Sequence, residues 1–214
     1  AMPYYNAPQS LPMALASLIA QHYGEWECLL IDDGSMESPA SIVDAFGDPR
    51  IRLFHLSHNL GTPIARQMAL DQAQGAYLCM LDADDWYYPA KLAQQVAVMA
   101  AEPKLTLVST GMAIVDEGGT LVGVRSRGPQ QAAPVIQGPW HQLTPLPIAH
   151  APSMIRMEQA QQIQYNPRLH RSQDTDFLLN VLWDGYFATL PTVTYAYAEY
   201  TSATPQKILA SYRY

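Results

Sequence analysis

The sequence predicts an α/β fold in which a mostly parallel central sheet carries helices on both faces. In the first hundred residues, compact apolar runs alternate with segments whose apolar residues recur at helical spacing. Prolines stand near the starts of three helical segments, and turns that contain Asp or Gly follow the apolar runs. Strands that alternate with helices build a parallel sheet, because each helix returns the chain to the edge where the next strand begins.

The first half of the chain contains the elements that establish this alternation. A helix capped by Ser10 is predicted to run to about residue 22, and further helices are expected to begin at Ser38, Thr62 and Pro89. Buried strands are predicted between these helices, at residues 27–31, 50–56 and 77–81. The segment Met2–Asn6 begins abruptly, so the first strand of the sheet is expected to be largely missing from this chain.

The second half has a different pattern. One helix is expected to begin at Ser172 or Gln173, and short strands are predicted at residues 105–109, 112–115, 121–124, 187–190 and 193–197. Residues 128–147 are rich in Pro and Gln and are interpreted as a long loop or a flap. Because no internal repeat and no linker interrupts the chain, residues 1–214 are expected to form a single domain.

Composition excludes several classes of function. The formal net charge is −7, the pI is about 5.2, and no run of Lys or Arg occurs. This charge argues against contact with a nucleic-acid backbone and against electrostatic binding to anionic membranes. No apolar run is long enough to span a bilayer, and no signal peptide is visible. Cys28 and Cys79 both lie in apolar runs, so we expect buried thiols in a cytoplasmic protein.

Two acidic clusters follow directly on predicted strands. Asp32-Asp33 ends one strand, and Asp82-Ala83-Asp84-Asp85 ends another. Ligands of open parallel sheets bind beyond the carboxyl ends of the strands, so both clusters are expected at one edge. Two carboxylates one residue apart can hold one divalent cation such as Mg²⁺ or Mn²⁺, or divide between a cation and a ribose. Most Asp-x-Asp tripeptides are solvated loops, however, so this pair of carboxylates alone does not establish a metal site.

A third motif lies between the two acidic clusters. Asn59-Leu60-Gly61, followed by Ala65-Arg66, opens the third helix. With the motifs in this order, the chain resembles the family 2 glycosyltransferases, whose nucleotide-binding half has the Rossmann-like GT-A fold. The resemblance is close from Pro3 to about Leu92 and becomes fainter toward Ser202. It implies that residues 1–101 are the nucleotide-sugar-binding half and residues 102–214 the acceptor-side half.

The resemblance implies a role for each matching residue on the donor side. Pro3 and Tyr5 belong to the segment that binds the nucleotide, with Tyr5 stacking on the base. Asp33 accepts a hydrogen bond from an imide N–H of the base, and Arg66 faces the diphosphate, which needs positive charge. The plain alternatives are an ordinary loop aromatic for Tyr5, a turn cap with Gly34 for Asp33 and a surface helix residue for Arg66.

The second acidic cluster matches the metal-binding motif of the family. Asp82 is implied to contact the ribose or the metal, Asp84 is implied to be the main metal ligand, and Asp85 orients the loop. The implied cofactor is Mn²⁺ or Mg²⁺, which neutralises the charge that builds up on a departing diphosphate.

The acceptor side is implied by a shorter match. The family carries its catalytic base as the Asp of a Glu-Asp pair near the start of a late helix, and Asp174 matches that base. Gln173 replaces the Glu, and Asp174 and Asp176 could instead merely favour a helix N-terminus. His150 stands where some relatives keep an acceptor-side His, with a buried structural role equally open. Trp140, in the Pro-rich segment, completes the acceptor-side candidates.

The resulting prediction is a hexosyltransferase-like enzyme that moves a sugar from a nucleotide-sugar, with UDP expected, to a hydroxyl acceptor by inversion. The acceptor is expected to be a saccharide, a lipid-linked group or another hydroxyl compound, as in polysaccharide biosynthesis of the cell envelope. The Gln-x-x-Arg-Trp motif of processive members is absent, so single transfers are expected. No nucleic-acid partner is expected; a homodimer and a place at the inner face of the membrane are compatible with the sequence.

Two other functions stay open. A nucleotidyltransferase also combines a parallel sheet with a metal, but its Gly-rich, Arg-containing loop is replaced here by Tyr4-Tyr5-Asn6-Ala7. A catalytically inactive nucleotide-binding or scaffolding domain is the second alternative. It is favoured by Gln173 and by the first strand that is expected to be largely missing.

Overall fold

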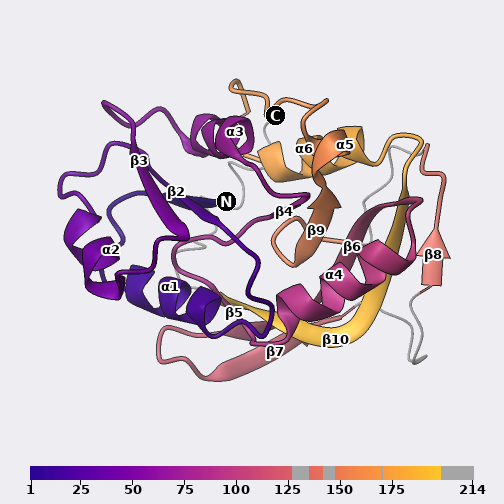
Figure 1. Ribbon diagram of the computed structural model, residues 1–214, viewed down its shortest axis with the longest axis horizontal. Coiled ribbons are helices and arrows are strands. Elements are labelled where there is room, and N and C mark those ends of the chain that lie inside the picture. The colour runs from indigo at the N-terminus through magenta and orange to yellow at the C-terminus, as the bar shows by residue number, and fades with distance from the viewer. Residues whose placement is uncertain (127–134, 142–147, 170, 199–214) are drawn as a thin grey trace.

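The computed structural model describes residues 1–126, 135–141, 148–169 and 171–198 (Figure 1). The helices are α1 (Leu11–Ile19), α2 (Ala40–Phe46), α3 (Thr62–Gln72), α4 (Lys91–Ala101), α5 (Met157–Ala160) and α6 (Gln173–Val181). The strands are β1 (Met2–Tyr4), β2 (Cys28–Asp32), β3 (Ile51–His55), β4 (Tyr77–Cys79), β5 (Trp86–Tyr87), β6 (Leu105–Val115), β7 (Leu121–Arg125), β8 (Val135–Gln137), β9 (Ser153–Arg156) and β10 (Tyr186–Ala198).

The first sheet is parallel, as the alternation of strands and helices predicts. Its order is β1-β2-β3, and Met2 pairs with Leu30, which in turn pairs with Leu53. All five residues of β2 are buried, as expected for a strand covered on both faces. The first strand, expected to be largely missing, is present as the three residues of β1.

Ala1 joins this sheet to the second one. Its ammonium nitrogen donates a hydrogen bond to the Cys79 carbonyl at 2.7 Å, and the Leu81 N–H donates to the Ala1 carbonyl at 3.0 Å. The N-terminus therefore lies between β2 and β4, as Figure 1 shows. The two sheets together follow the strand order β3-β2-β1-β4-β9-β6-β10-β5.

The second sheet is mixed, so the parallel pattern holds for the first sheet only. β6 and β10 run parallel, whereas β4–β9, β6–β9, β6–β7 and β5–β10 are antiparallel. The short turn at residues 116–120 forces the antiparallel pair β6–β7, since a parallel pair needs a long crossover. Four short elements, β5, β8, β9 and α5, were not predicted, because segments of two to four residues show no periodicity.

Two predicted interruptions lie inside continuous strands. The strands predicted at 105–109 and 112–115 are one strand, β6, which passes through Thr110-Gly111. Likewise, the strands predicted at 187–190 and 193–197 are both part of β10. The pairing register of β10 shifts between Thr189 and Val193, and this irregularity accommodates Pro191, which has no N–H to donate.

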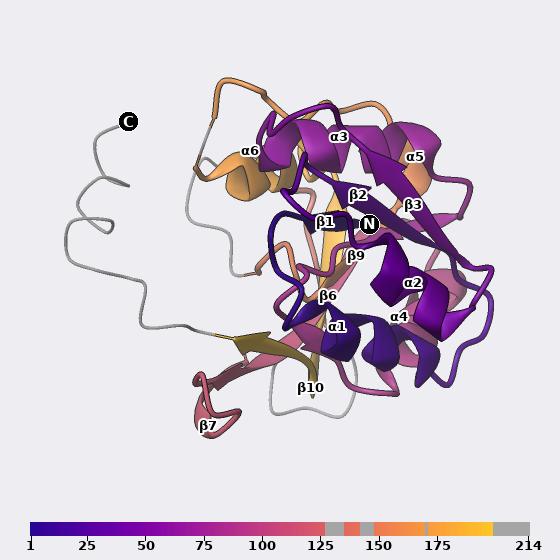
Figure 2. The same ribbon diagram turned by 90° about the vertical axis from the view of Figure 1, so that its left-hand side faces the viewer.

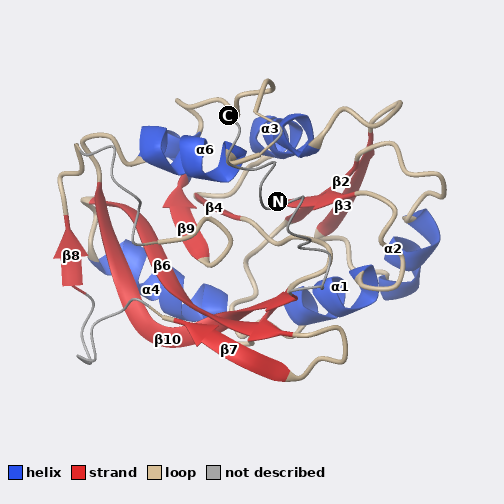
Figure 3. Cartoon of the chain, turned by 180° about the vertical axis from the view of Figure 1, so that it is seen from behind, coloured by secondary structure: helices blue, strands red, loops and turns tan. Residues whose placement is uncertain are grey.

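The helices form two layers around the strands. Figures 1 and 2 show α3, α5 and α6 on one side and α1, α2 and α4 on the other. Figure 3 shows the same layers from behind, with the long strands β6 and β10 curving beside α4. Alternate residues of β2 divide between the layers, because successive side chains of a strand point to opposite faces: Leu30 packs in the cluster of α1, and Ile31 in that of α3.

The start of α1 differs from its prediction. Ser10 occupies the N-cap position, but its side chain makes no capping hydrogen bond; its hydroxyl lies 3.4 Å from the Ala7 carbonyl instead. The helix also ends at Ile19, three residues earlier than predicted. Burial of Leu11, Leu15 and Leu18 therefore holds α1 in place without the predicted cap.

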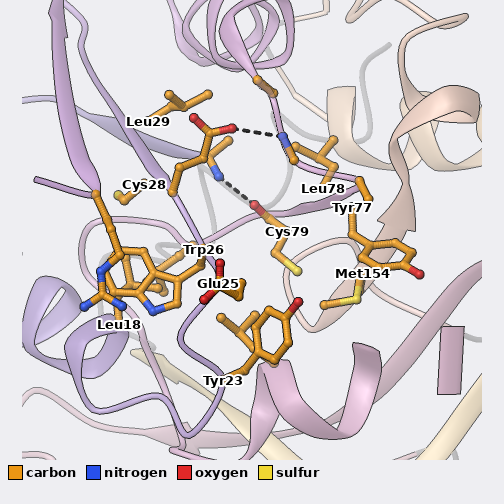
Figure 4. A pocket seen from close by; sticks show the side chains of 18 of the residues that line it. Leu18, Tyr23, Glu25, Trp26, Cys28, Leu29, Tyr77, Leu78, Cys79 and Met154 are labelled. Carbon is orange, nitrogen blue, oxygen red and sulfur yellow. Dashed lines mark hydrogen bonds between the residues drawn. The ribbon is translucent and has the colours of Figure 1, made fainter. Parts of the chain in front are cut away.

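A cavity of about 550 Å³ opens at the amino-terminal ends of β2 and β4 (Figure 4). Its walls include Trp26, Cys28, Tyr77 and Cys79, together with Ala1. Both acidic clusters follow the opposite, carboxyl ends of these strands, so the cavity is separate from the predicted site. No helix in the described parts of the chain has both the length and the apolar character to cross a membrane.

The turn after β2 imposes a strict requirement for glycine. Gly34 has φ +70°, and a Cβ atom there would lie 2.6 Å from the Asn59 nitrogen and would overlap the His58 backbone. Gly119 has a similar φ of +76°, but a Cβ atom there would meet nothing within 4 Å. A Cβ atom at Gly119 would therefore cause backbone strain alone, whereas one at Gly34 would cause the same strain together with steric overlap.

We predict that Gly34→Ala destabilises the protein more than Gly119→Ala. Both variants carry the strain of a positive φ, about 1–2 kcal/mol, and Gly34→Ala adds about 1–3 kcal/mol of overpacking. Urea denaturation of the two variants and the wild type measures the difference. If both variants lost the same free energy of unfolding, the loop at His58 would have to move aside without an energetic cost.

Candidate active site

The predicted nucleotide-binding segments lie together at the carboxyl ends of β1 and β2. The Asn6 N–H donates to the Ser35 hydroxyl at 3.0 Å, and the Met36 N–H donates to the Asn6 side-chain oxygen at 2.9 Å. These bonds tie the loop that carries Tyr5 to the loop that follows Asp33. Pro3 lies in β1, and Tyr5, just beyond that strand, is 49% exposed, so its ring is accessible to a ligand.

Asp33 holds the third motif in place. Its buried carboxylate accepts hydrogen bonds from the N–H groups of Leu60 at 2.7 Å and Gly61 at 2.9 Å. The alternative that Asp33 caps the turn with Gly34 is wrong, because Asp32 accepts the bond from Ser35 N–H. Asp33 is 4% exposed, and each of its carboxylate oxygens keeps a further lone pair.

Arg66 is buried, and the alternative of a surface residue is therefore wrong. Its side chain is 8% exposed, and its Nη2 donates to Asp82 Oδ1 at 3.0 Å. Burial alone would lower the pKa of the Arg66 guanidinium, yet the acidic groups around it raise that pKa above its ordinary value. The groups responsible are Asp82, Tyr165 and Asp174. The guanidinium therefore stays charged between the donor-side and acceptor-side acids.

Asp84 and Asp82 are the two partly buried acids of the loop. Burial raises the pKa of Asp84, with a further rise from the charge of Asp82. Asp82 itself is 32% exposed. Among the described residues, no three His, Cys, Asp or Glu side chains cluster as metal ligands. A cation on Asp82 and Asp84 would therefore need oxygen ligands from its substrate, as Mg²⁺ and Mn²⁺ sites on phosphates usually have.

Asp85 anchors the acidic loop to β10, in agreement with its predicted role in orienting the loop. It is 1% exposed and accepts hydrogen bonds from the Tyr195 hydroxyl at 2.5 Å and the Ala198 N–H at 2.8 Å. Burial raises the pKa of Asp85 to about 8, although both bonds favour its charged form. Asp85 therefore lies away from solvent and is not available to a ligand.

Asp174 and Asp176 lie in the first turn of α6. The charge of Asp174 acts on both Arg66 and Tyr165, so the predicted base lies near enough to both groups for an electrostatic interaction. Gln173 begins the helix, and its side-chain oxygen is buried without a hydrogen-bond partner. The N-terminus of a helix favours negative charge at both acids. The alternative that Asp174 and Asp176 only stabilise the start of α6 therefore agrees with this geometry as well.

His150 lies inside an aromatic cluster. It is 3% exposed, and its Nε2 lies 2.9 Å from the Tyr165 hydroxyl. Its ring meets Tyr165 and Phe177 edge-on, and those two rings stack on each other at 4.0 Å. Burial and then the charge of Arg66 hold the pKa of His150 well below its ordinary value. This burial favours the structural reading of His150 over contact with an acceptor.

Trp140 belongs to the β10 side of the protein. Its ring lies edge-on to Phe187 at 5.8 Å, and its backbone N–H donates to the Gly185 carbonyl at 3.1 Å. Of the predicted flap at 128–147, only residues 135–141 lie within the described part of the chain, so the flap itself is not described. The acceptor-side role of Trp140 stays a prediction.

Tyr165 is the residue that the sequence analysis missed. It lies between α5 and α6, is 3% exposed, stacks on Phe177 of α6 and donates its N–H to Gln67, the residue after Arg66 in α3. The available signal was a lone aromatic in the polar segment Gln161–Arg168. An isolated aromatic among polar residues indicates a buried anchor, but it does not indicate which helices the ring touches.

Comparisons with known proteins assign the chain to a family. The model of the family described as Glycosyl transferase family 2 matches residues 1–149. TuaG of Bacillus subtilis (strain 168), named for teichuronic acid biosynthesis, is 30% identical over 188 residues, 87% of this chain and 72% of TuaG. WfgD of Escherichia coli is 36% identical over 98 residues, which are 46% of this chain and 39% of WfgD.

Solved structures show the same fold. TarS of S. aureus has a TM-score of 0.74 and 19% identity over 92% of this chain and 36% of its own. A TarS 1–349 structure has a TM-score of 0.75 and 20% identity over 92% of this chain and 59% of that one. The family match and the similarity to TuaG, together with this fold, show that the chain is a glycosyltransferase that belongs to family 2 and has the GT-A fold.

Proposed function

We propose that the chain transfers a sugar from a UDP-linked donor to an acceptor hydroxyl, with inversion and one transfer per encounter. The observation that carries this proposal is the buried Arg66. Its guanidinium forms an ion pair with Asp82 of the acidic loop and interacts electrostatically with Asp174. The Arg66 guanidinium thus interacts with Asp82, which is expected to hold the donor, and with Asp174, which is expected to activate the acceptor. Such a charge stabilises a departing diphosphate in a site that excludes water.

Named properties of similar proteins support the choice of donor. TarS 1–349 was solved in complex with UDP and with UDP-GlcNAc, and WfgD is named as a UDP-Glc:alpha-D-GlcNAc-diphosphoundecaprenol beta-1,3-glucosyltransferase. The chain spans only 39% of WfgD and 59% of that TarS structure, so these names support the donor and acceptor of this chain as proposals only. For the acceptor we propose a lipid-linked or saccharide hydroxyl of cell-envelope polysaccharide synthesis.

The residues present fit a divalent cation. Asp82 and Asp84 are close enough for the charge of Asp82 to raise the pKa of Asp84, and a cation between two like charges would relieve that repulsion. Asp84 would be the main ligand, and Asp82 would divide between the cation and Arg66. When bound, Mn²⁺ or Mg²⁺ supplies charge neutralisation for the diphosphate.

The other residues bind the donor and remove the acceptor proton. Tyr5 would stack on the base, and Asp33 would accept a hydrogen bond from its imide N–H while holding the Leu60–Gly61 backbone. Asp174 would take the proton of the acceptor hydroxyl as that oxygen attacks the anomeric carbon. A base on the face opposite the leaving diphosphate gives inversion of configuration.

We predict that UDP binds only when Mn²⁺ or Mg²⁺ is present, because the acidic loop and the diphosphate repel each other without a cation. Isothermal titration calorimetry with UDP, in Mn²⁺ and then in EDTA, measures this dependence. Equal affinity in the two buffers would contradict the metal site. Binding without any UDP release from UDP-glucose or UDP-GlcNAc would favour an inactive nucleotide-binding domain.

We predict that Asp84→Asn lowers metal-dependent UDP release by about 100-fold or more, since it removes the charged ligand of a Lewis-acid cation. The melting temperature should change little, because Asp84 is partly exposed at a loop. Asp44→Asn, at an exposed position of α2, is the matched control and should leave turnover unchanged. Wild-type turnover in Asp84→Asn would remove Asp84 from the metal site.

We predict that Asp174→Asn lowers transfer by about 10²- to 10⁴-fold, the usual contribution of a general base. UDP affinity should stay near the wild-type value, because the donor contacts come from the first half of the chain. Asp176→Asn, in the same helical turn, is the comparison variant. Loss of transfer together with loss of UDP affinity would indicate a structural helix start, and full transfer would make Asp176 the next candidate.

A further inference from the structure

Tyr165 connects the helix that carries Arg66 to the helix that carries Asp174. On one side, its N–H donates a hydrogen bond to the side-chain oxygen of Gln67 at 2.9 Å. Gln67 directly follows Arg66 in α3. The backbone of Tyr165 is therefore fixed to α3, the helix that carries Arg66.

On its other side, the Tyr165 ring holds α6. It stacks on Phe177 with ring centroids 4.0 Å apart and an angle of 5° between the planes. Phe177 is fully buried and lies three residues after Asp174, so both side chains project from the same side of the helix. Any shift of Phe177 against the Tyr165 ring would therefore move Asp174 with it.

The hydroxyl of Tyr165 points to a third element. It lies 2.9 Å from Nε2 of His150, and the imidazole also meets Phe177 edge-on at 5.7 Å. The three rings form a closed cluster in which each ring touches the other two. Such a cluster resists displacement, because moving one ring opens contacts with both of the others.

Three charged groups act on the buried phenol of Tyr165. Burial raises the pKa of Tyr165, and the charges of Arg66, Asp82 and Asp174 all act on it. The Tyr165 phenol is therefore neutral, and its ring packs in the apolar cluster that includes Phe177 and Leu178 of α6. Its N–H binds Gln67 beside Arg66, so Tyr165 links this apolar packing of α6 to α3.

We propose that Tyr165 is a positioning residue that sets the place of Asp174 relative to Arg66 through its stack on Phe177. The proposal rests on the role of Asp174 as the base. A base must lie within hydrogen-bond reach of the acceptor hydroxyl, and a misplacement of about 1 Å can cost on the order of 10²-fold in rate. The ring stack supplies the rigidity, and the hydroxyl contributes only the contact with His150.

The test compares Tyr165→Leu, which removes the stack, with Tyr165→Phe, which keeps it. Tyr165→Leu should lower kcat for UDP release from UDP-glucose or UDP-GlcNAc by about 10- to 100-fold. KM for the donor and Kd for UDP should stay within about twofold of wild type. Tyr165→Phe should retain kcat within about threefold. Phe177→Leu, which removes the stack from the other side, should reproduce Tyr165→Leu and serves if that variant does not fold.

Met99→Ala is the matched control for loss of core packing. Met99 is fully buried near the end of α4, and its removal costs about 2–5 kcal/mol without touching the cluster. Assayed below its melting temperature, Met99→Ala should keep wild-type kcat. If Tyr165→Leu also keeps wild-type kcat and loses only stability, Tyr165 is an ordinary core residue and the proposal is overturned. A parallel loss of UDP affinity would also overturn it.

A readout without turnover separates this proposal from the proposed function. Amide hydrogen exchange of residues 173–177 should be faster in Tyr165→Leu than in wild type and unchanged in Met99→Ala. Unchanged exchange in Tyr165→Leu would show that the stack does not hold α6, whatever the activity. If wild-type protein bound UDP but released none from either donor while this exchange difference persisted, the proposed function would fail and the positioning of α6 would stand.

Discussion

The ion pair between Arg66 and Asp82 is the interaction on which the candidate site depends. A buried guanidinium costs several kcal/mol of lost hydration unless acids compensate for it. Asp82 supplies a direct partner at 3.0 Å, and the charge of Asp174 acts on Arg66 from the other half of the chain. Arg66 lies on α3, Asp82 follows β4 and Asp174 lies in the first turn of α6. The Arg66 guanidinium therefore interacts with acids from both halves of the chain.

The acidic loop shows how neighbouring residues of one type acquire different roles. Asp82, Asp84 and Asp85 fall within four positions, yet only Asp85 has both oxygens occupied by buried protein donors. That anchoring fixes the end of the loop to β10 and leaves Asp82 and Asp84 at its partly exposed side. Environment therefore divides the three acids into one structural anchor and two candidates for ligand contact.

The sequence predicted the parallel half of the fold and the gathering of its motifs, because strand ends of a parallel sheet meet at one edge. Asp33 beside the Leu60–Gly61 backbone and Arg66 beside Asp82 both follow from that rule. The sequence left His150 open between an acceptor-side role and a buried structural role, because the choice depends on Tyr165 and Phe177, which the fold brings to it. The mixed second sheet also escaped prediction, since β9 and β5 are too short to show periodicity, and the predicted Ser10 cap does not form.

The close approach of Gly34 to the loop at His58 constrains one side of the contact only. The atoms that a Cβ would meet belong to the backbone of His58 and Asn59, not to their side chains. Residue 58 is exposed and can change freely as far as this contact is concerned, whereas residue 34 cannot accept even a methyl group. Tolerance to substitution is therefore unequal between two positions that touch, so co-variation between them would not reveal the contact.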